Sequence, residues 1–274
     1  MRRFQQVDVF TSTPYLGNPV AVVLDADGLS TEEMAAVASW TNLSETTFVL
    51  PPTAAGADYR VRIFTPVEEL PFAGHPTLGT CHAWLRSGGT PADEERIVQE
   101  CAAGLVPLRP IGGRLAFAAP ALVQEGPVDD ATLDEVLAGL GTSREAVVDA
   151  TWADNGPGWI AVRLTSVDAL RALAPATLQR TVGVVALTAG DDHVDLELRA
   201  FFPVDGVTRE DPVTGSLNAS VAQWLLGTGV LAAPYVARQG GALGRAGRIH
   251  VSQSDGEIWI AGDTLTLVEG TIDL

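Results

Sequence analysis

The sequence contains no lysine, and all 17 of its basic residues are arginine. Pyridoxal-phosphate enzymes hold their cofactor as a Schiff base on a lysine, and P-loop nucleotide hydrolases place a lysine beside the phosphates. The chain lacks the amine that both classes need. It also has no G-x-S-x-G elbow and no G-x-G-x-x-G turn after a strand, so serine-hydrolase and dinucleotide-binding functions have no support.

Positive charge is scarce, because 17 basic residues stand against 34 acidic ones and give 274 residues a formal net charge of −17. A surface of this sign repels nucleic-acid phosphates and anionic lipid head groups, so we expect neither as a partner. No apolar run reaches the length of a membrane span, and the first ten residues lack the apolar core of a secretion signal. We expect a cytoplasmic protein with a well-formed core, since 46% of its residues are hydrophobic.

Cysteine is nearly absent, with only Cys81 and Cys101. Two cysteines are too few for a disulfide framework or a structural zinc site, so two buried free thiols are expected. His75 and His82 lie seven positions apart on one helix face, but no cysteine or carboxylate lies at ligand spacing beside them. We therefore predict no metal site.

One motif occurs twice. The pattern Arg-x-Phe-x-Pro begins at Arg62 and again at Arg199, 137 positions later, which is half the chain length. In both halves a small-residue turn, a helix-like stretch, a Trp-Leu pair and a glycine then follow in the same order. This repeated order indicates a duplication and predicts two similar lobes.

Strands and helices are mixed without regular alternation, which favours an α+β fold over a doubly wound parallel sheet. Ser30 and Glu33 form the capping-box pattern of a helix that runs to about Trp40, and Pro76 is expected as the first residue of a second helix. Further helices are expected over 131–140 and 215–226, a hairpin over 248–267, and strands over 4–10, 18–24, 46–50, 59–64, 97–100, 106–109, 115–118, 158–164, 182–188 and 194–202.

A lobe boundary is expected between 120 and 130, where proline, glycine and acidic residues are mixed. We predict an N-terminal lobe over 1–122 and a C-terminal lobe over 123–263. The sequence leaves open whether the last strand, 264–274, returns to the first lobe.

The first candidate site residue is Glu45, which lies between a predicted helix and a predicted strand. At the edge of an apolar strand the charged form of a carboxylate is disfavoured, and such a carboxylate is suited to both taking and returning a proton. The alternative is a solvated glutamate at a helix exit, and position alone does not decide between the two.

Two small-residue turns, at Gly74-His75 and around Gly215, carry the other candidates, and the equivalent turns of two lobes are expected to face each other across a cleft. A helix starting at each glycine would offer free N–H groups to a substrate carboxylate. His75 is then a candidate proton shuttle or donor, and Asp211 a candidate to orient it or to bind a substrate amine or hydroxyl. The alternatives are a turn or capping role for Asp211 and a satisfied first-turn histidine. The glycine-rich stretch 240–245 is expected to be a loop, with Arg245 as a candidate anion contact.

Five separated motifs resemble the PhzF phenazine-biosynthesis isomerase family, in the family's order from residue 4 to about 270. They are the strand at 4–11 with Gly17-Asn18-Pro19, the stretch Asn42-Leu43-Ser44-Glu45-Thr46, Pro71-Phe72-Ala73-Gly74-His75, Glu210-Asp211-Pro212-Val213-Thr214-Gly215-Ser216, and Gln239-Gly240 with Gly244-Arg245.

The resemblance implies a diaminopimelate-epimerase-like fold, in which each of two lobes wraps a mainly antiparallel sheet round a central helix. It also implies a homodimer that uses no metal or organic cofactor. The reaction implied is the isomerisation of trans-2,3-dihydro-3-hydroxyanthranilate or a similar small carboxylic acid. One glutamate of the family removes a proton and delivers one elsewhere on the ring.

Carried over residue by residue, Glu45 is the acid and base, and His75 and Asp211 complete the catalytic set. Asn18, Ser44, Gly74, Gly215 and Ser216 fall among the substrate-binding positions, with the two glycine amides at the carboxylate.

The sequence departs from the family at Trp40, where relatives more often carry a polar residue, and at Pro76, where alanine is common. Both departures bear on the shape of the pocket and so on the substrate. Related thiol-dependent epimerases place a cysteine at each facing turn, but Cys81 and Cys101 lie outside both turns here. Two alternatives stay open, which are a non-catalytic metabolite-binding protein on the same scaffold and an epimerase of another carboxylic acid.

Overall fold

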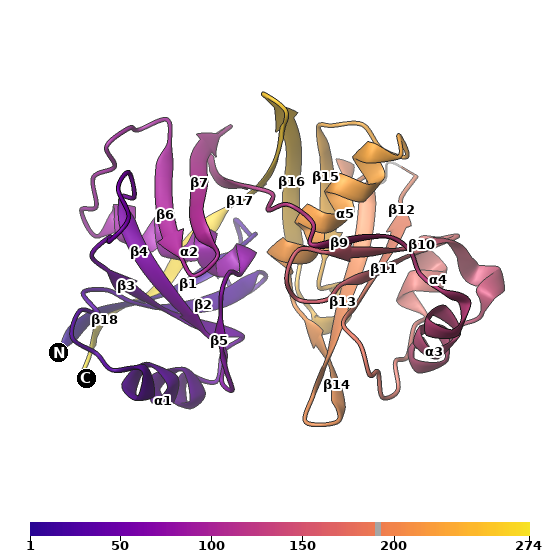
Figure 1. The fold of residues 1–274 in the computed structure, drawn as a ribbon, viewed down its shortest axis with the longest axis horizontal. Helices are drawn as coiled ribbons and strands as arrows, with labels where there is room; N and C mark the ends of the chain where they lie inside the picture. The colour runs from indigo at the N-terminus through magenta and orange to yellow at the C-terminus, as the bar shows by residue number, and fades with distance from the viewer. Residues whose placement is uncertain (190–192) are drawn as a thin grey trace. The chain divides into compact units, whose positions relative to one another are not determined.

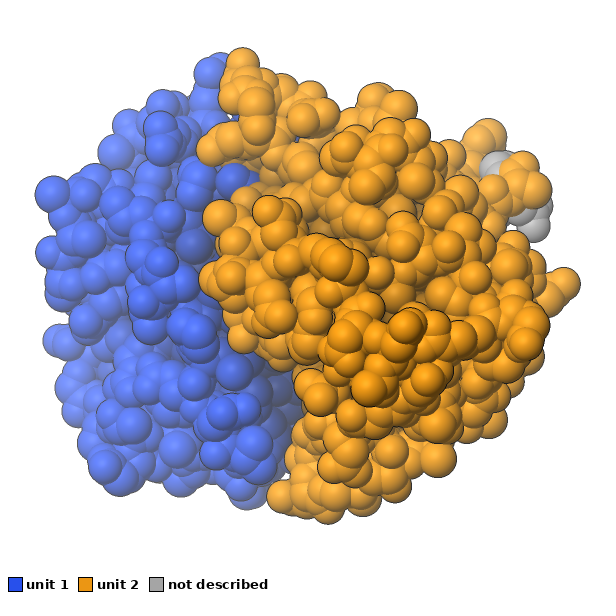
Figure 2. Space-filling view, turned by 45° about the vertical axis from the view of Figure 1, so that its right-hand side comes forward, with its two compact units in different colours: residues 1–118, 261–274 blue, residues 119–260 orange. Residues whose placement is uncertain are grey.

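The computed structural model describes residues 1–189 and 193–274, which form two compact units. Unit 1 comprises Met1–Ala118 and Ala261–Leu274, and unit 2 comprises Ala119–Ile260 (Figure 2). The chain therefore leaves unit 1 after Ala118 and returns to it at Ala261.

Unit 1 consists of strands around one buried helix, with a second helix on the outside of the strands (Figure 1). The buried helix, α2, contacts β1, β2, β3, β8 and β18, and nine of its 13 residues are buried. The elements are β1 (Arg2–Val9), β2 (Asn18–Val23), α1 (Thr31–Thr41), β3 (Glu45–Leu50), β4 (Tyr59–Phe64), β5 (Glu69–Leu70), α2 (Gly74–Arg86), β6 (Ile97–Cys101), β7 (Gly104–Ile111), β8 (Arg114–Ala118) and β18 (Thr264–Ile272).

The alternation of side chains along the strands decides which residues meet each helix. On β3, Phe48 and Leu50 point outward and join Met34 of α1 in an apolar cluster. Thr47 has the opposite direction and accepts a hydrogen bond from Thr80 of α2 at 2.8 Å. Helix α2 can lie this close because Gly79 has no side chain, since a Cβ there would come within 2.4 Å of a methyl of Val20 on β2.

Unit 2 also has one buried helix, α5, and places two short helices, α3 and α4, on the outside of its strands. The elements are β9 (Gln124–Pro127), α3 (Asp130–Leu140), β10 (Val147–Asp154), β11 (Ile160–Leu164), α4 (Val167–Arg171), β12 (Val182–Leu187), β13 (Leu196–Val204), β14 (Val207–Asp211), α5 (Gly215–Gly227), β15 (Tyr235–Gln239), β16 (Gly247–Ser254) and β17 (Glu257–Gly262), the last of which runs on into unit 1.

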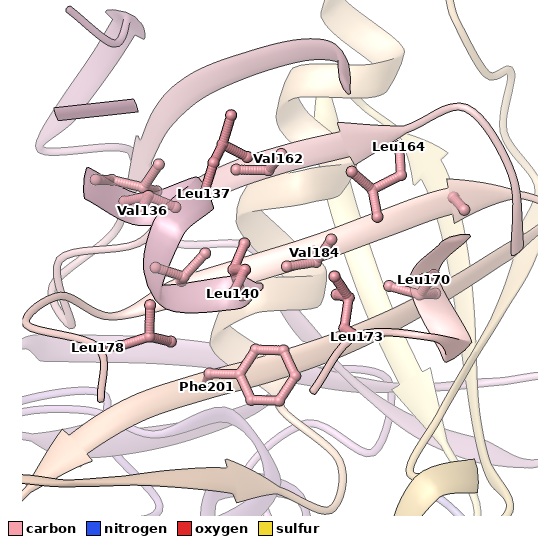
Figure 3. Close-up of a cluster of buried hydrophobic side chains, with 13 residues drawn as sticks. Val136, Leu137, Leu140, Val162, Leu164, Leu170, Leu173, Leu178, Val184 and Phe201 are labelled. Carbon is pink, nitrogen blue, oxygen red and sulfur yellow. The ribbon is translucent and has the colours of Figure 1, made fainter. Parts of the chain in front are cut away.

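The apolar core of unit 2 lies between α3, α4 and the outer face of β11, β12 and β13 (Figure 3). Leu140 of α3 and Leu170 of α4 pack there against Val162, Val184 and Phe201, all 1% exposed or less. Full burial of such side chains stabilises by roughly 1.5–3 kcal/mol each. The opposite face of β12 receives α5.

The two units repeat the same ladder. In unit 1, β1 pairs antiparallel with β2, β2 parallel with β3, and β3 antiparallel with β4. In unit 2, β10, β11, β12 and β13 pair in the same succession of directions. The next strand again forms a short antiparallel arm, β5 or β14, before the buried helix begins. The repeat expected from the sequence is therefore present in the topology.

Local predictions differ from the structure at two points that matter for the site. Helix α2 begins at Gly74, not at Pro76, because a proline is tolerated throughout the first turn, where no N–H has a helical partner. Asp211 ends a strand, β14, in a region where no strand was predicted. The capping box of Ser30 and Glu33 is confirmed by both of its hydrogen bonds. Among the helices of the described ranges, none has the length and apolar character needed to cross a bilayer.

Candidate active site

Glu45 is the first residue of β3 and points toward α2. Helix α1 ends at Thr41, and the left-handed backbone of its C-cap, Asn42 (φ 54°), turns the chain toward the strand that begins three residues later. Because side chains alternate along a strand, Glu45 shares the face of Thr47, which contacts α2. The Glu45 side chain is 14% exposed, so a largely buried carboxylate retains access from outside.

The carboxylate meets a histidine on the first turn of α2. Nε2 of His75 lies 3.1 Å from Oε2 of Glu45, and the His75 side chain is only 4% exposed. The other ring nitrogen, Nδ1, lies 3.3 Å from the side-chain nitrogen of Asn18, which begins β2 and is fully buried. Ser44 completes the group, since its hydroxyl donates to the Asn18 side-chain oxygen at 3.4 Å. We call Asn18, Ser44, Glu45 and His75 the Glu45 cluster.

Burial keeps the histidine of this cluster neutral. It lowers the pKa of His75 to about 3, although a hydrogen bond to the backbone of Pro19 acts in the opposite direction. Proline has no N–H, so its carbonyl must be the acceptor and the ring the donor. At neutral pH, His75 therefore carries one ring proton and no charge.

The ring proton that His75 donates to Pro19 is on Nδ1, because Nε2 makes no hydrogen bond within the described structure and faces Glu45 at 3.1 Å. With the proton on Nδ1, Nε2 becomes an acceptor for the proton of a Glu45 carboxylic acid. The pair can hold a proton on glutamate without forming a buried imidazolium.

The start of α2 has no side-chain cap. Ala73 at the N-cap supplies no side-chain hydrogen bond, so the amides of Gly74 and His75 are not capped by it. Buried polar groups fix this turn from behind: Thr77 donates to the Ala73 carbonyl at 2.9 Å, and Gln99 donates to Thr77 at 3.0 Å. The uncapped N–H groups of this turn and the positive end of the helix dipole favour a carboxylate.

Unit 2 presents a second polar group around Asp211, at the end of β14. The carboxylate of Asp211 accepts a hydrogen bond from the Thr214 hydroxyl at 2.5 Å. Gln239 of β15 holds the same turn, because its side-chain oxygen accepts from the Thr214 amide at 2.9 Å and its nitrogen donates to the Asp211 carbonyl at 3.0 Å. We call Asp211, Thr214, Ser216 and Gln239 the Asp211 cluster.

Helix α5 starts in this cluster and, like α2, lacks a side-chain cap. Thr214 is its N-cap but makes no side-chain cap, which leaves the amide of Gly215 to other partners. The Ser216 hydroxyl accepts from the indole nitrogen of Trp159 at 3.1 Å, and Asn155 donates to the Ser216 carbonyl at 3.0 Å. Since its oxygen already accepts, the Ser216 hydroxyl proton remains to be donated.

Within unit 1 the structure brings the five candidates together, which are Asn18, Ser44, Glu45, Gly74 and His75. Within unit 2 it places the other three around the start of α5, and these are Asp211, Gly215 and Ser216. It gives His75 the partners Asn18 and Glu45, while orientation of His75 by Asp211 stays a prediction. Sequence reasoning did not identify Trp159 and Asn155. The signal available was the glycine-rich turn 155–158 directly before β11.

The cysteines are free and buried, as expected. Burial raises the pKa of the Cys81 thiol to about 12, and burial also raises the pKa of Cys101. A thiol in this state is a poor base or nucleophile. Across residues 1–189 and 193–274, no group of three or more His, Cys, Asp or Glu side chains is arranged to hold a metal ion.

Comparison with known sequences gives one family. Residues 7–270 match the sequence model of the PhzC-PhzF family, described as phenazine biosynthesis-like proteins. The trans-2,3-dihydro-3-hydroxyanthranilate isomerase of Pseudomonas aeruginosa is 41% identical over 229 residues, 81% of this chain and 79% of that protein. The enzyme of the same name from Pseudomonas fluorescens is 34% identical over the whole of both chains. A Schizosaccharomyces pombe protein named antisense-enhancing sequence 1 is 39% identical over 81% of this chain and 79% of its own.

Solved structures agree on the fold. A PhzF-family protein of Bacillus anthracis superposes with a TM-score of 0.84 at 24% identity, covering 100% of this chain and 99% of the other. A protein of Agrobacterium radiobacter described as a probable proline racemase gives a TM-score of 0.62 at 13% identity, over 100% of this chain and 93% of its own. The α+β, diaminopimelate-epimerase-like fold expected from the sequence is confirmed.

Proposed function

The chain belongs to the phenazine biosynthesis-like PhzC-PhzF family and is an isomerase, and we propose that it shifts a proton on a small cyclic or unsaturated amino- or hydroxy-carboxylic acid. A compound like trans-2,3-dihydro-3-hydroxyanthranilate fits this class, and two relatives carry the name of its isomerase. The observation that carries the proposal is the Glu45 carboxylate held 3.1 Å from a buried neutral His75.

In the proposed reaction Glu45 is first the base and then the acid. Its carboxylate takes a proton from an activated carbon, the C–H electron pair moves into the conjugated system, and a double bond shifts. The resulting Glu45 carboxylic acid then returns a proton to another carbon of the same molecule. One C–H bond breaks and one forms, so the step needs no oxidant, reductant or second substrate.

The other candidate residues have positioning and binding roles in this proposal. His75 accepts from the Glu45 carboxylic acid through Nε2, and Asn18 and Ser44 orient the imidazole ring. The Gly74 and Gly215 amides bind the substrate carboxylate. Asp211 and Ser216 bind its amine or hydroxyl group, through the carboxylate of Asp211 and the free hydroxyl proton of Ser216.

The proposal is tested with Glu45→Gln, which keeps the size of the side chain and removes the base. Proton NMR in D₂O with 2,3-dihydro-3-hydroxyanthranilate should show conversion and deuterium entering the product with the wild-type chain. We expect Glu45→Gln to lower turnover by at least about 100-fold and to leave ligand binding nearly intact. Glu68→Gln, at an exposed glutamate of the same unit, is the matched control and should turn over normally.

Each other outcome has a definite meaning. Wild-type turnover by Glu45→Gln would remove Glu45 from the reaction. Ligand-induced thermal stabilisation without any proton exchange would favour a metabolite-binding protein, and exchange of a Cα proton with inversion would favour an epimerase of another carboxylic acid. Homodimer formation and a cytoplasmic location stay predictions.

A further inference from the structure

Two side chains from one turn of unit 2 hold Ser216 at the start of α5, and the proposed reaction gives a role to neither. The turn connects β10 to β11, and β10 contacts α5. Asn155 donates its side-chain nitrogen to the Ser216 carbonyl at 3.0 Å. Trp159 donates its indole nitrogen to the Ser216 hydroxyl oxygen at 3.1 Å. One turn therefore contacts both the backbone and the side chain of Ser216.

Hydrogen bonds within the turn define where its last residue lies. The Asp154 carboxylate accepts from the amides of Gly156 and Gly158 at 2.7 Å and 2.6 Å. Both glycines have a positive φ, 134° and 82°, which residues with a side chain rarely adopt. The Trp159 carbonyl accepts from the Ala153 amide at 3.0 Å, and Trp159 is only 3% exposed. These bonds and the burial of Trp159 set the position of its indole.

The direction of the hydrogen bond between Trp159 and Ser216 follows from the two groups themselves. An indole nitrogen is only a donor, so the serine oxygen must be the acceptor. A hydroxyl group has one proton and two lone pairs, and the indole occupies one lone pair. Ser216 is 7% exposed, so a ligand group that can only donate would leave the hydroxyl proton buried and unpaired. Such a mismatch weakens binding by at least about tenfold.

Unit 1 holds its corresponding residue from the corresponding connection. His75 follows the glycine that begins α2, as Ser216 follows the glycine that begins α5. Asn18, where the connection from β1 enters β2, lies with its side-chain nitrogen 3.3 Å from Nδ1 of His75. In both units the connection between the first two strands of the repeated ladder thus contacts the second residue of the buried helix. In unit 2 the contacting side chain is a donor, the indole of Trp159.

We propose that Trp159 is a positioning residue that makes Ser216 a hydrogen-bond donor and so selects an oxygen acceptor on the ligand. The inference rests on the proposed function, in which a compound like trans-2,3-dihydro-3-hydroxyanthranilate brings a carboxylate, an amine and a hydroxyl group. The helix amides take the carboxylate, and Asp211, whose carboxylate only accepts, takes the amine. The hydroxyl oxygen remains for the Ser216 proton. Trp159 therefore favours a hydroxyl over an amino group at this position of the ligand.

The test compares two aromatic ligands of similar size, 3-hydroxyanthranilate and 2,3-diaminobenzoate. They differ only at carbon 3, where one carries a hydroxyl group and the other an amino group that is a donor and a poor acceptor. Calorimetric titration of the full wild-type chain should give at least about tenfold tighter binding of 3-hydroxyanthranilate. In Trp159→Phe the ratio of the two Kd values should fall below about threefold. The released Ser216 hydroxyl can then donate to a nearby backbone carbonyl and accept from the amino group.

A purely structural role of Trp159 would weaken both ligands equally and leave this ratio unchanged. Trp152→Phe is the matched control, because Trp152 is another tryptophan of unit 2 and packs against its apolar core. It should keep the wild-type ratio. Ser216→Ala should lose the preference as Trp159→Phe does, and it keeps the test decisive if Trp159→Phe does not fold, which far-UV circular dichroism checks. In Ser216→Ala one indole signal of the proton–nitrogen NMR spectrum should also shift, because Trp159 loses its acceptor.

Three results would overturn the inference. They are equal or absent binding of the two ligands by the wild-type chain, a wild-type ratio in folded Trp159→Phe, and unshifted indole signals in Ser216→Ala. A failure of the proposed function is a different result, namely normal turnover by Glu45→Gln. The ratio is measured without turnover and on residues of unit 2, so the two failures are distinguishable.

Discussion

The two units build the same arginine contact in different surroundings. In unit 1, Arg62 on β4 lies 5.0 Å from the ring centre of Phe64 and pairs with Glu69 on β5 at 2.6 Å. In unit 2, Arg199 on β13 lies 4.9 Å from the ring centre of Phe201 and pairs with Glu210 on β14 at 2.7 Å. The repeated sequence motif is therefore a repeated cation–π and ion-pair contact that fixes the short arm before the buried helix.

The surroundings differ in burial. The side chains of Arg62 and Glu69 are 26% and 33% exposed, whereas those of Arg199 and Glu210 are each 10% exposed. Arg199 also donates to the carbonyls of Leu170 and Leu173, at 3.3 Å and 2.9 Å, and so connects β13 to the end of α4. The same contact serves the surface of one unit and the interior of the other.

The two units differ more in the residues at their corresponding candidate site positions than in how those units pack. Thr46 pairs with Phe64 and Val182 pairs with Phe201, so the residue that corresponds to Glu45 in unit 2 is Thr181. The helix starts likewise place Ser216 where unit 1 has His75. Unit 1 carries the ionisable pair, and unit 2 carries hydroxyl groups at the same places. A shared scaffold does not require a shared chemical role.

The largest stability effect is expected from Arg199→Met. It leaves the largely buried Glu210 carboxylate without its arginine and removes the Arg199 hydrogen bonds to the Leu170 and Leu173 carbonyls, which costs about 3–5 kcal/mol. Urea denaturation, followed by hydrogen exchange in peptides of unit 2, measures the loss. Arg199→Lys is the control, because it keeps the charge but loses the two-point contact. If Arg199→Met lowered the free energy of unfolding by less than about 1 kcal/mol, the greater burial of the Arg199 contact would not make it more stabilising than the Arg62 contact.

The second prediction concerns the loss of stability between pH 6.5 and 4.5, which should be larger in unit 1 than in unit 2. Burial gives folded His75 a pKa of about 3 against 6.5 unfolded, so the unfolded chain binds more protons as the pH falls below 6.5. Stability should therefore fall by about 2–3 kcal/mol between pH 6.5 and 4.5. His82, whose pKa is also lowered by burial, adds in the same direction.

Hydrogen exchange of unit 1 peptides at pH 6.5 and 4.5 tests this difference. His75→Gln should remove most of the loss, and Ser216→Ala, the corresponding change in unit 2, should leave it unchanged. An equal loss in His75→Gln and the wild-type chain would contradict the assignment to His75.

The repeated motif could be recognised in the sequence, but the ion-pair partners of its arginines could not be predicted from it. The Arg-x-Phe-x-Pro pattern predicted the duplication, yet neither Glu69 nor Glu210 could be assigned as a partner, because each lies on a separate strand whose register the sequence does not state. Strand β14 was missed because its run Val-Thr-Arg-Glu-Asp lacks the apolar alternation of a half-buried strand.

The candidate site shows the same limit. Glu45 and His75 were recognisable in separate motifs, but their 3.1 Å contact depends on the packing of α2 against β3, to which residues such as Gly79 and Thr80 contribute. Trp159 was not identified because a buried indole reads as core until its hydrogen bond to Ser216 is seen.

The smallest effect is expected from Arg62→Met, the unit 1 counterpart of the first prediction. The Arg62 guanidinium donates to both oxygens of Glu69 and to the Thr31 hydroxyl at the start of α1, but water reaches all of these groups. Solvent replaces the lost hydrogen bonds and screens the charge, so we expect a cost of about 0.5–1 kcal/mol, measured by the same exchange method on unit 1. Raising the salt concentration should shrink this cost further and leave that of Arg199→Met nearly unchanged, because mobile ions screen exposed pairs far more than buried ones. Equal salt dependence in both variants would mean that the difference in burial between the two contacts does not change how strongly mobile ions screen them.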